Sequence, residues 1–209
     1  MARNEDLYAA ILRGDRAKVQ DIFTTAIEHN QDVNELLDDS MIPAMREMGG
    51  RFSRNEIYVP EMLIAARAMQ AGLNLIEPIL ALNKRQSPGK IAVGTVKGDL
   101  HDIGKNLVAI MLKGAGYEVI DIGTNCSVDK YDEAVAAGAR IVMCSALLTT
   151  TMTYMQEVVN HFRGNAAIKV VIGGAPVTQN YADSIGAHGY GRDANEAVKI
   201  VERLLSAAA

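Results

Sequence analysis

The segment VGTVKGDLHDIGKNLV, residues 93–108, joins an apolar run, a turn bounded by glycines and the start of a helix. It has the outline of a phosphate-binding loop, in which four residues separate the two glycines and Ser or Thr follows the lysine. Here five residues separate Gly98 from Gly104, and asparagine follows Lys105. The turn also contains two aspartates, whose negative charge would repel phosphates. We therefore reject a nucleotide site for this segment.

Composition bounds the class of protein. The chain has 209 residues, 49% of them hydrophobic, which is enough for one large or two smaller domains. A net charge of -4 and the lack of a basic run argue against a nucleic-acid partner. The first residues, MARNEDLYAAILRGD, contain no apolar signal region, and no segment is long enough to span a bilayer. We expect a cytoplasmic protein with neither a nucleic-acid nor a membrane partner.

The two cysteines, Cys126 and Cys144, show neither a CxxC spacing nor a zinc-like spacing. We expect both to be free thiols, as is usual in a reducing compartment. Cys144 lies in an apolar run and is expected in the core. Cys126 follows a Gly-Thr-Asn turn and is expected to be exposed.

The character of the sequence changes near residue 85, which predicts two domains, residues 1–85 and 86–209, joined by a linker over Asn83–Lys90. Helical periodicity in the first half predicts a small four-helix bundle, in which Pro43 and Pro78 would kink or end their helices. The segment 49–59 is expected to be a loop that exposes Phe52 and Tyr58. Four methionines at helical spacings are expected to fill the core: Met41, Met45, Met48 and Met69. The predicted helices are Glu5–Arg13, Arg16–Asn30, Val33–Met48 and Pro60–Ala81.

The second half alternates short Val/Ile-rich runs with amphipathic stretches, a pattern typical of βα units. It predicts a Rossmann-like (flavodoxin-like) α/β domain, in which five parallel strands are covered by helices on both faces. The predicted strands are Ile91–Val96, Tyr117–Asp121, Ile141–Ser145, Lys169–Ile172 and His188–Tyr190. The predicted helices are Ile103–Lys113, Val128–Ala137, Thr151–Arg163, Thr178–Ile185 and Asn195–Ser206.

Ligands of such sheets lie outside the carboxyl ends of the strands. This rule places four loops on one edge: GDLHD (98–102), GTNCS (123–127), SALLTT (145–150) and GGAP (173–176). A double glycine most often marks only a tight turn. Together with Gly94 in the first strand, however, Gly173 and Gly174 indicate a slot beside the sheet that a ligand could enter.

His101 is the histidine that stands out, because Asp99 lies two residues before it in an extended turn. The carboxylate could orient one imidazole nitrogen and leave the other free to coordinate a metal. One protein ligand is too few for a structural zinc site. The metal would therefore arrive inside a cofactor that supplies the other ligands. The His-Asp pair also resembles part of a phosphohydrolase site, but four histidines on unrelated elements could not supply its metal ligands.

Three motifs occur in order along the second half: Asp99-Leu100-His101-Asp102-Ile103-Gly104, Ser145-Ala146-Leu147 and Gly173-Gly174. They resemble the DxHxxG, SxL and GG signature of cobalamin-binding domains of the methionine synthase type. In the first half, MGGRFSRNEIYVPEM (48–62) resembles the helical cap over the cofactor in that family. Length and domain order are most similar to the small corrinoid proteins of anaerobic methyltransferase systems.

The resemblance implies that His101 is the lower axial ligand of cobalt and that Asp99 hydrogen-bonds to it. The third member of this catalytic group falls on Thr151, with Thr149 and Thr150 as alternatives. Ser145 and Thr149 would contact the nucleotide tail or its benzimidazole. The implied cofactor-binding residues are Gly98, Asp99, Leu100, His101, Asp102, Ile103, Gly104, Ser145, Leu147, Thr149, Gly173 and Gly174, with Phe52, Val59 and Met62 over the methyl face.

The function implied by the resemblance is that of a methyl carrier with cobalamin or a related corrinoid, whose cobalt alternates between Co(I) and methyl-Co(III). A substrate-specific methyltransferase would donate the methyl group, and a second methyltransferase would pass it to coenzyme M or tetrahydrofolate. A reductive activase would restore Co(I), and chemistry would require these partners. Alternatives are a cobalamin-dependent sensor or regulatory module, the cobalamin-binding subunit of a mutase, and a flavodoxin-like module without metal.

Overall fold

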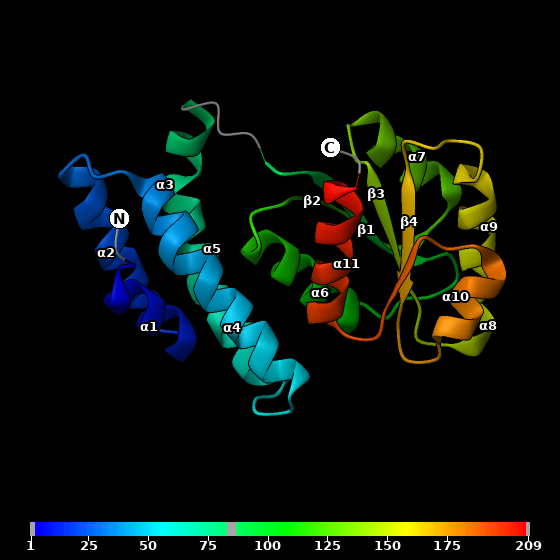
Figure 1. Ribbon diagram of the computed structural model, residues 1–209, viewed down its shortest axis with the longest axis horizontal. Coiled ribbons are helices and arrows are strands. Elements are labelled where there is room, and N and C mark those ends of the chain that lie inside the picture. The colour runs from blue at the N-terminus through cyan, green and yellow to red at the C-terminus, as the bar shows by residue number, and fades with distance from the viewer. Residues whose placement is uncertain (1–2, 83–86, 208–209) are drawn as a thin grey trace. The chain divides into compact units, whose positions relative to one another are not determined.

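The computed structural model describes residues 3–82 and 87–207 (Figure 1). The chain divides near residue 86 into two compact units, one helical and one α/β. The expected domain boundary and the first part of the expected linker, residues 83–86, lie outside the described residues. Lys90 already belongs to the first strand.

The helical unit begins each of its first three helices with a side-chain cap, because Asn4, Asp15 and Asp32 accept hydrogen bonds from backbone amides of the first turn. Gly14, with φ 68°, ends the first helix in the left-handed conformation. The predicted helical bundle is confirmed, and the four core methionines are buried. Its elements are α1 (Glu5–Arg13), α2 (Arg16–Glu28), α3 (Val33–Leu36), the π-helical turn η1 (Leu37–Met41), α4 (Ile42–Ser53) and α5 (Val59–Leu82).

The third predicted helix was wrong in its continuity and in its end. It contains the π-helical turn η1 just before Pro43, whose missing N–H removes one regular backbone bond. It also continues through Gly49 to Ser53, so Phe52 lies on a helix and is half-buried instead of exposed in a loop. Pro78, in contrast, lies inside α5 without ending it.

Asn55 explains why α4 ends later than expected. Its φ of 58° supplies the left-handed residue after the helix, and the amide of Glu56 reaches back to the carbonyl of Arg51 at 2.9 Å. The Gly-Gly pair before it has no positive φ, and Arg51 forms an ion pair at 2.8 Å with Glu47 one turn earlier. The remaining loop is short, and it exposes Tyr58 as expected, at 65%.

Within the described residues, the second unit contains a five-stranded parallel sheet in the order β2-β1-β3-β4-β5, which confirms the predicted fold. Right-handed crossovers place α6 on one face and α7, α9 and α10 on the other, while α11 packs on β5 (Figure 1). The elements are β1 (Lys90–Val96), α6 (Ile103–Gly114), β2 (Glu118–Cys126), α7 (Val128–Ala136), β3 (Ile141–Ser145), α8 (Thr149–Met152), α9 (Tyr154–Phe162), β4 (Lys169–Gly173), α10 (Gln179–Ile185), β5 (Gly189–Gly191) and α11 (Ala194–Ser206).

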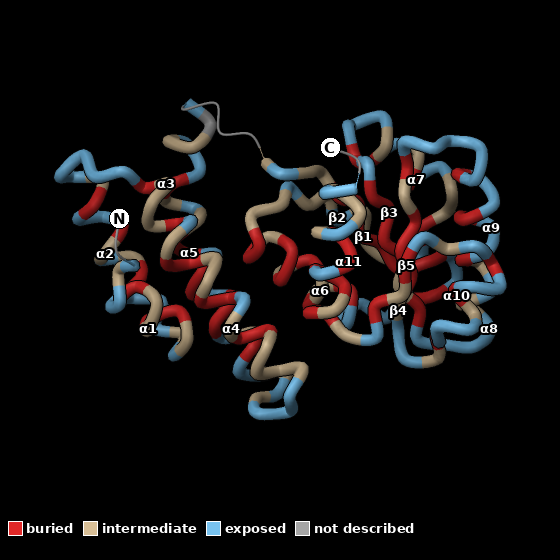
Figure 2. Tube along the Cα trace, in the orientation of Figure 1, coloured by how far each residue is buried: buried red, intermediate tan, exposed pale blue. Residues whose placement is uncertain are grey.

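The core of this unit lies between the sheet and the helices α7, α9 and α10, and Figure 2 shows the central strands buried along their length. Tyr131 is fully buried there and donates a hydrogen bond from its hydroxyl to the carbonyl of Gly94 at 3.3 Å. Burial raises the pKa of the Cys144 thiol to about 12. Cys144 is therefore the inert core thiol that its apolar run predicted.

The prediction for Cys126 was wrong: it is buried and is the last residue of β2, not part of an exposed turn. The strand continues through two register shifts against β1, in a stretch where Gly123 and Asn125 both have positive φ. Gly94 makes the space that Cys126 and Ile122 fill, since a Cβ on it would lie 2.6 Å from Cγ1 of Ile122 and 3.1 Å from Sγ of Cys126. The space beside Gly94 is therefore occupied by protein.

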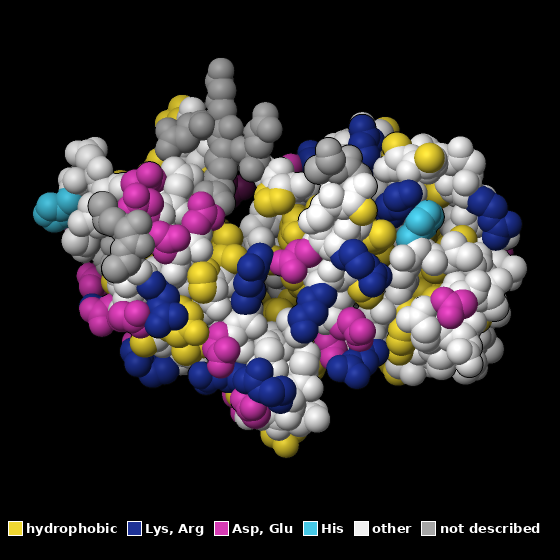
Figure 3. Space-filling view, viewed as in Figure 1, with side chains coloured by type: hydrophobic (Ala, Val, Ile, Leu, Met, Phe, Trp, Pro, Cys, Tyr) yellow, Lys and Arg dark blue, Asp and Glu magenta, His cyan; other side chains and the backbone are white. Residues whose placement is uncertain are grey.

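No helix within residues 3–82 and 87–207 is both long and apolar enough to cross a membrane. On the face shown in Figure 3, Lys and Arg side chains are interspersed with Asp and Glu.

The packing around Gly94 generates a stability prediction. Gly94→Ala would force Ile122 to move, and we expect the free energy of unfolding to fall by about 1–3 kcal/mol in urea denaturation. Gly164→Ala is the matched control, because nothing lies within 4 Å of a Cβ added at Gly164. Equal unfolding midpoints for the two variants would show that the space beside Gly94 is not filled.

Candidate functional site

The loop between β1 and α6 is held by its own backbone and by the strand below it. Gly98 turns the chain with φ 83°, and the amide of Asp99 donates to the carbonyl of Val96 at 3.1 Å. The buried hydroxyl of Thr95 donates to the carbonyl of His101 at 2.8 Å. These bonds fix the main chain that carries the Asp99 and His101 side chains.

The carboxylate of Asp99 is the centre of the site. Its side chain is buried, and each oxygen has two donors. Oδ1 accepts from the backbone amide of His101 at 3.0 Å and lies 2.7 Å from Nδ1 of the same residue. Oδ2 accepts from the amide of Leu147 at 2.8 Å and from the hydroxyl of Thr151 at 2.6 Å. The carboxylate therefore joins the loops that follow β1 and β3.

These donors determine the charge of the site. Burial opposes ionisation of Asp99, but the Thr151 hydroxyl, the two backbone amides and the imidazole together hold its pKa well below the usual range. An ionised carboxylate only accepts hydrogen bonds, so Nδ1 of His101 carries the proton. In the neutral ring with its proton on Nδ1, Nε2 keeps the lone pair with which imidazole binds a metal.

His101 combines this fixed orientation with access from outside. Its side chain is 53% exposed although its aspartate partner is buried. In the part of the chain that the structure describes, no group forms a hydrogen bond with Nε2. The imidazole thus presents one nitrogen to a ligand above the carboxyl edge of the sheet.

Of the three threonines that the sequence left open, Thr151 is the one that contacts Asp99. Its hydroxyl also lies 3.0 Å from the carbonyl of Leu148. Thr149 and Thr150 belong to the same short helix α8, but their side chains are exposed. Successive residues of a helix point about 100° apart, so only Thr151 is directed at the carboxylate.

Exposed apolar side chains lie on both sides of His101 in the sequence and in the connection between β3 and α8. Leu100 is 73% exposed, Ile103 is 71% exposed and Leu147 is 44% exposed. Asp102 and Gly104 are also exposed, and a Cβ added at Gly104 would meet nothing within 4 Å. Contiguous apolar exposure of this kind usually marks a binding surface. Exposed apolar residues beside the histidine suit a large ligand with an apolar face.

Small residues form a row across the sheet at its carboxyl edge. Thr95 pairs with Ser145, Ser145 with Gly173, and Gly173 with Gly191. Because side chains alternate along a strand, these four residues share one face. Ser145 and Gly173 are half-buried, so the row is open at this point.

The expected slot of three glycines needs one correction. Gly94 lies one residue before Thr95 and faces the opposite side of the sheet, where protein fills its space. Gly173 and Gly174 remain together at the end of β4. A Cβ on Gly173 would lie 2.7 Å from the carbonyl oxygen of Gly191, and Gly174 has φ 126° against the backbone of Ala146. Neither position accepts a side chain without moving backbone.

The three residues predicted from the cap motif lie in the helical unit. Phe52 on α4 and Val59 at the start of α5 are half-buried. Met62 is fully buried. It joins Ala65 and Met69 in the buried stripe of α5, at the spacing of successive helical turns.

Two polar residues near the site escaped the sequence analysis. Lys105 on α6 is 3% exposed, and its Nζ lies 2.6 Å from both carboxylate oxygens of Asp121 on β2. Burial opposes ionisation of Asp121, but this ion pair lowers its pKa. Asn125 contacts the Gly98–Asp99 backbone from the end of β2. Both contacts join distant segments, so no local pattern could have revealed them.

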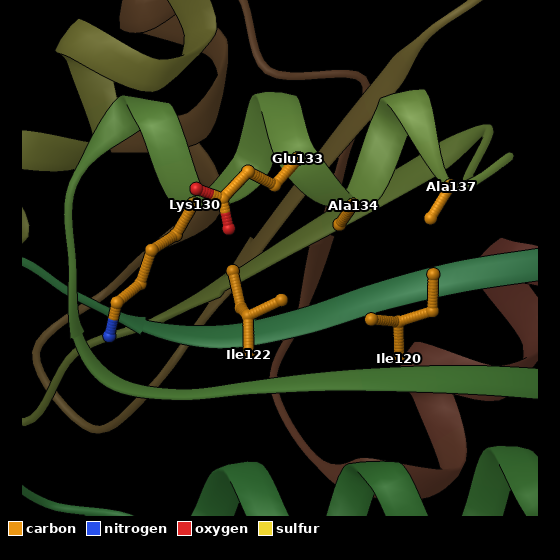
Figure 4. Close-up of a pocket in the computed structure, with 6 residues that line it drawn as sticks. All are labelled: Ile120, Ile122, Lys130, Glu133, Ala134 and Ala137. Atoms are coloured by element: carbon orange, nitrogen blue, oxygen red, sulfur yellow. The ribbon is translucent and has the colours of Figure 1, made fainter.

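A separate hollow of ≈ 270 Å³ lies between β2 and α7 (Figure 4). Ile120 and Ile122 point toward Ala134 and Ala137 across it, with Lys130 and Glu133 beside them on α7. None of the residues predicted for the site lines it.

Comparison with known proteins gives the same assignment for both halves. Residues 89–199 match the B12 binding domain family, and residues 3–77 match a second B12 binding domain family. A corrinoid protein of Desulfitobacterium hafniense (strain Y51) is 34% identical over 212 residues, which cover 98% of each chain. The chain belongs to the family of B12-binding corrinoid proteins.

Other members of the family extend over the whole chain. The trimethylamine corrinoid protein of Methanosarcina barkeri is 36% identical over 216 residues, covering 99% of this chain and 100% of that protein. Among solved structures, the methanol:cobalamin methyltransferase complex of M. barkeri contains a chain with TM-score 0.83 and 28% identity, covering 96% of this chain and 78% of that one. A cobalamin-binding protein of D. hafniense DCB-2 has TM-score 0.76 and 28% identity, covering 94% and 96%.

The cofactor of this family is cobalamin or a related corrinoid, and the residues present fit it. In the described residues, no three His, Cys, Asp or Glu side chains gather into a metal site of their own. A metal at His101 must therefore bring its other ligands with it, as the cobalt of a corrinoid does. The apolar surface around His101 and the row of small residues beside it suit a broad ring with a tail.

The bond between Thr151 and Asp99 generates the second prediction. Thr151→Val keeps the shape of the side chain but removes a donor to a buried charge, so we expect the cofactor-free protein to lose about 1.5–3 kcal/mol in urea denaturation at neutral pH. Thr151→Ser keeps the hydroxyl and is expected to lose less than about 1 kcal/mol. If the valine variant were as stable as the serine variant, the hydroxyl would not be what holds the carboxylate.

Proposed function

We propose that the protein is a corrinoid methyl carrier, which accepts a methyl group from a substrate-specific methyltransferase and passes it to a second methyltransferase. The observation that carries the proposal is the outward imidazole of His101, held from behind by the buried carboxylate of Asp99. Relatives described as methylamine corrinoid proteins and the likeness to a methanol:cobalamin methyltransferase complex support the same role.

Three side chains, those of His101, Asp99 and Thr151, would form the metal-binding part of the site. Nε2 of His101 would bind the cobalt of the corrinoid. Asp99 keeps the proton on Nδ1 and would stabilise positive charge on the imidazole as the ligand bond tightens. Thr151 holds Asp99 in place through its 2.6 Å bond. When bound, the corrinoid supplies a cobalt ion that takes up a methyl group and gives it away.

The surrounding residues would hold the rest of the cofactor. Leu100, Ile103 and Leu147 would lie against the ring and exclude water from its lower face. The nucleotide tail would enter along the row of small residues, beside Ser145, Thr149 and the double glycine. In the helical unit, Phe52 and Val59 would shield the upper face, whereas Met62 is buried within the unit.

The open site implies that reaction partners provide the remaining chemistry. His101 and its apolar neighbours Leu100, Ile103 and Leu147 are exposed. One methyltransferase would bring the methyl donor and would determine which donor is used. A second would carry the methyl group to coenzyme M or tetrahydrofolate, and a reductive activase would return oxidised cobalt to Co(I).

The proposal is tested by anaerobic reconstitution with hydroxocobalamin, followed by electron paramagnetic resonance of the Co(II) form. We expect nitrogen hyperfine splitting in the wild type and its loss in His101→Ala, because Nε2 supplies the axial nitrogen. After reduction to Co(I), the wild type should take up a methyl group from methyl iodide, seen in the visible spectrum.

His161→Ala is the matched control. His161 also pairs with an aspartate, Asp132 at 2.8 Å, but it lies on α9 away from the loops of the site. We expect this variant to retain the nitrogen splitting. A wild type that retains no corrinoid, or a spectrum that is the same with and without His101, would overturn the proposed function.

A further inference from the structure

A single asparagine at the end of β2 holds the backbone from which Asp99 and His101 project. The amide of Gly98 donates to Oδ1 of Asn125 at 2.8 Å. In return, the amide of Asn125 donates to the carbonyl of Asp99 at 3.0 Å. Asn125 therefore bonds to both residues at the start of the loop, one through its side chain and one through its main chain.

The irregularity of β2 is what brings Asn125 to this loop. Val93 pairs with Asp121, whereas Val96 pairs with Cys126, so β2 contains two more residues than β1 over this stretch. Gly123, with φ 83°, and Asn125, with φ 51°, have left-handed backbone in this stretch. Bulges of this kind commonly redirect a side chain next to a functional site. Asparagine is also one of the few residue types that tolerate a left-handed backbone.

The carboxylate network alone does not fix the position of the imidazole. The four donors orient the side chain of Asp99. The position of that side chain and of the imidazole also depends on the backbone of the loop that carries both residues. Asn125 bonds to that loop from the edge strand, on the side away from Leu147 and Thr151 of the β3–α8 connection. The loop is therefore tied to β2 by its backbone and to the β3–α8 connection by its carboxylate.

We propose that Asn125 is a positioning residue for the cobalt-binding histidine, and that its Oδ1 keeps the Asp99–His101 pair in the ligating arrangement before the cofactor arrives. This inference rests on the proposed function, because it takes His101 as the axial ligand. When a metal ligand becomes ordered only on binding, the free energy of ordering it lowers the affinity for the metal. The Asn125 bonds order the loop already when the protein folds, so this free energy no longer reduces the affinity.

Asn125→Gly is the decisive variant. Glycine adopts φ 51° freely and keeps the backbone donor to Asp99, so only the side-chain acceptor is lost. Asn125→Asp keeps an acceptor oxygen in the same place and serves as the rescue. Asn30→Gly is the matched control, since Asn30 has the same φ of 51° but lies at the end of α2 in the helical unit.

Two measurements follow on the same proteins. In the reconstituted Co(II) form, we expect the ratio of nitrogen-ligated to unligated cobalt to fall roughly two- to tenfold in Asn125→Gly, the change that one hydrogen bond implies. Without cofactor, hydrogen exchange at the Gly98 amide should accelerate by a similar factor. Asn125→Asp and Asn30→Gly should match the wild type in both measurements.

Each other outcome is informative. If Asn125→Gly matches the wild type in nitrogen ligation, or if Asn30→Gly lowers it equally, the positioning role is overturned. Failure of Asn125→Gly to fold would assign Asn125 to overall stability and would overturn it too. A wild type without nitrogen splitting would instead remove the ligand role of His101, while the exchange rate of Gly98 would still report whether Asn125 holds the loop.

Discussion

The burial of one ionised carboxylate constrains the rest of the site. An unpaired charge in a protein interior is too costly to keep, so Asp99 is tolerated only because donors fill both of its oxygens. The donors come from two loops separated in sequence. Moving either loop would leave the charge unsatisfied, which makes the carboxylate a constraint on backbone position as well as a partner for His101.

The place of this carboxylate follows from the topology of the sheet. The strand order β2-β1-β3 means that the chain leaves β1 toward one side and β3 toward the other, so the crossover helices cover opposite faces. The loops after β1 and β3 diverge at this point, which is where open α/β sheets bind ligands. Asp99 lies in the first loop, and Thr151 lies just after the second. Their bond spans the divergence, and the imidazole lies over it.

The sequence predicted the architecture well because periodicity and strand length are local properties. It failed where one local signal has two structural meanings. Gly123 and Asn125 look like the turn that ends a strand, yet they form bulges within β2, because Gly94 on the neighbouring strand leaves room for Cys126. Gly49 and Gly50 look like the end of a helix, yet α4 continues until Asn55 supplies the left-handed residue. Tertiary packing decides both cases.

The site was predictable to the extent that its members are neighbours in sequence. Asp99 and His101 are two residues apart, so their pairing could be predicted. The resemblance implied a hydroxyl after β3. It left the choice among three adjacent threonines open, because these residues differ only in their direction around the helix. Lys105 and Asn125 have partners on other elements and gave no signal. Their contacts join the β1–α6 loop and α6 to β2. The histidine side chain is exposed, while the carboxylate beside it is buried and bonded to two separate loops, so access and orientation are assigned to different residues.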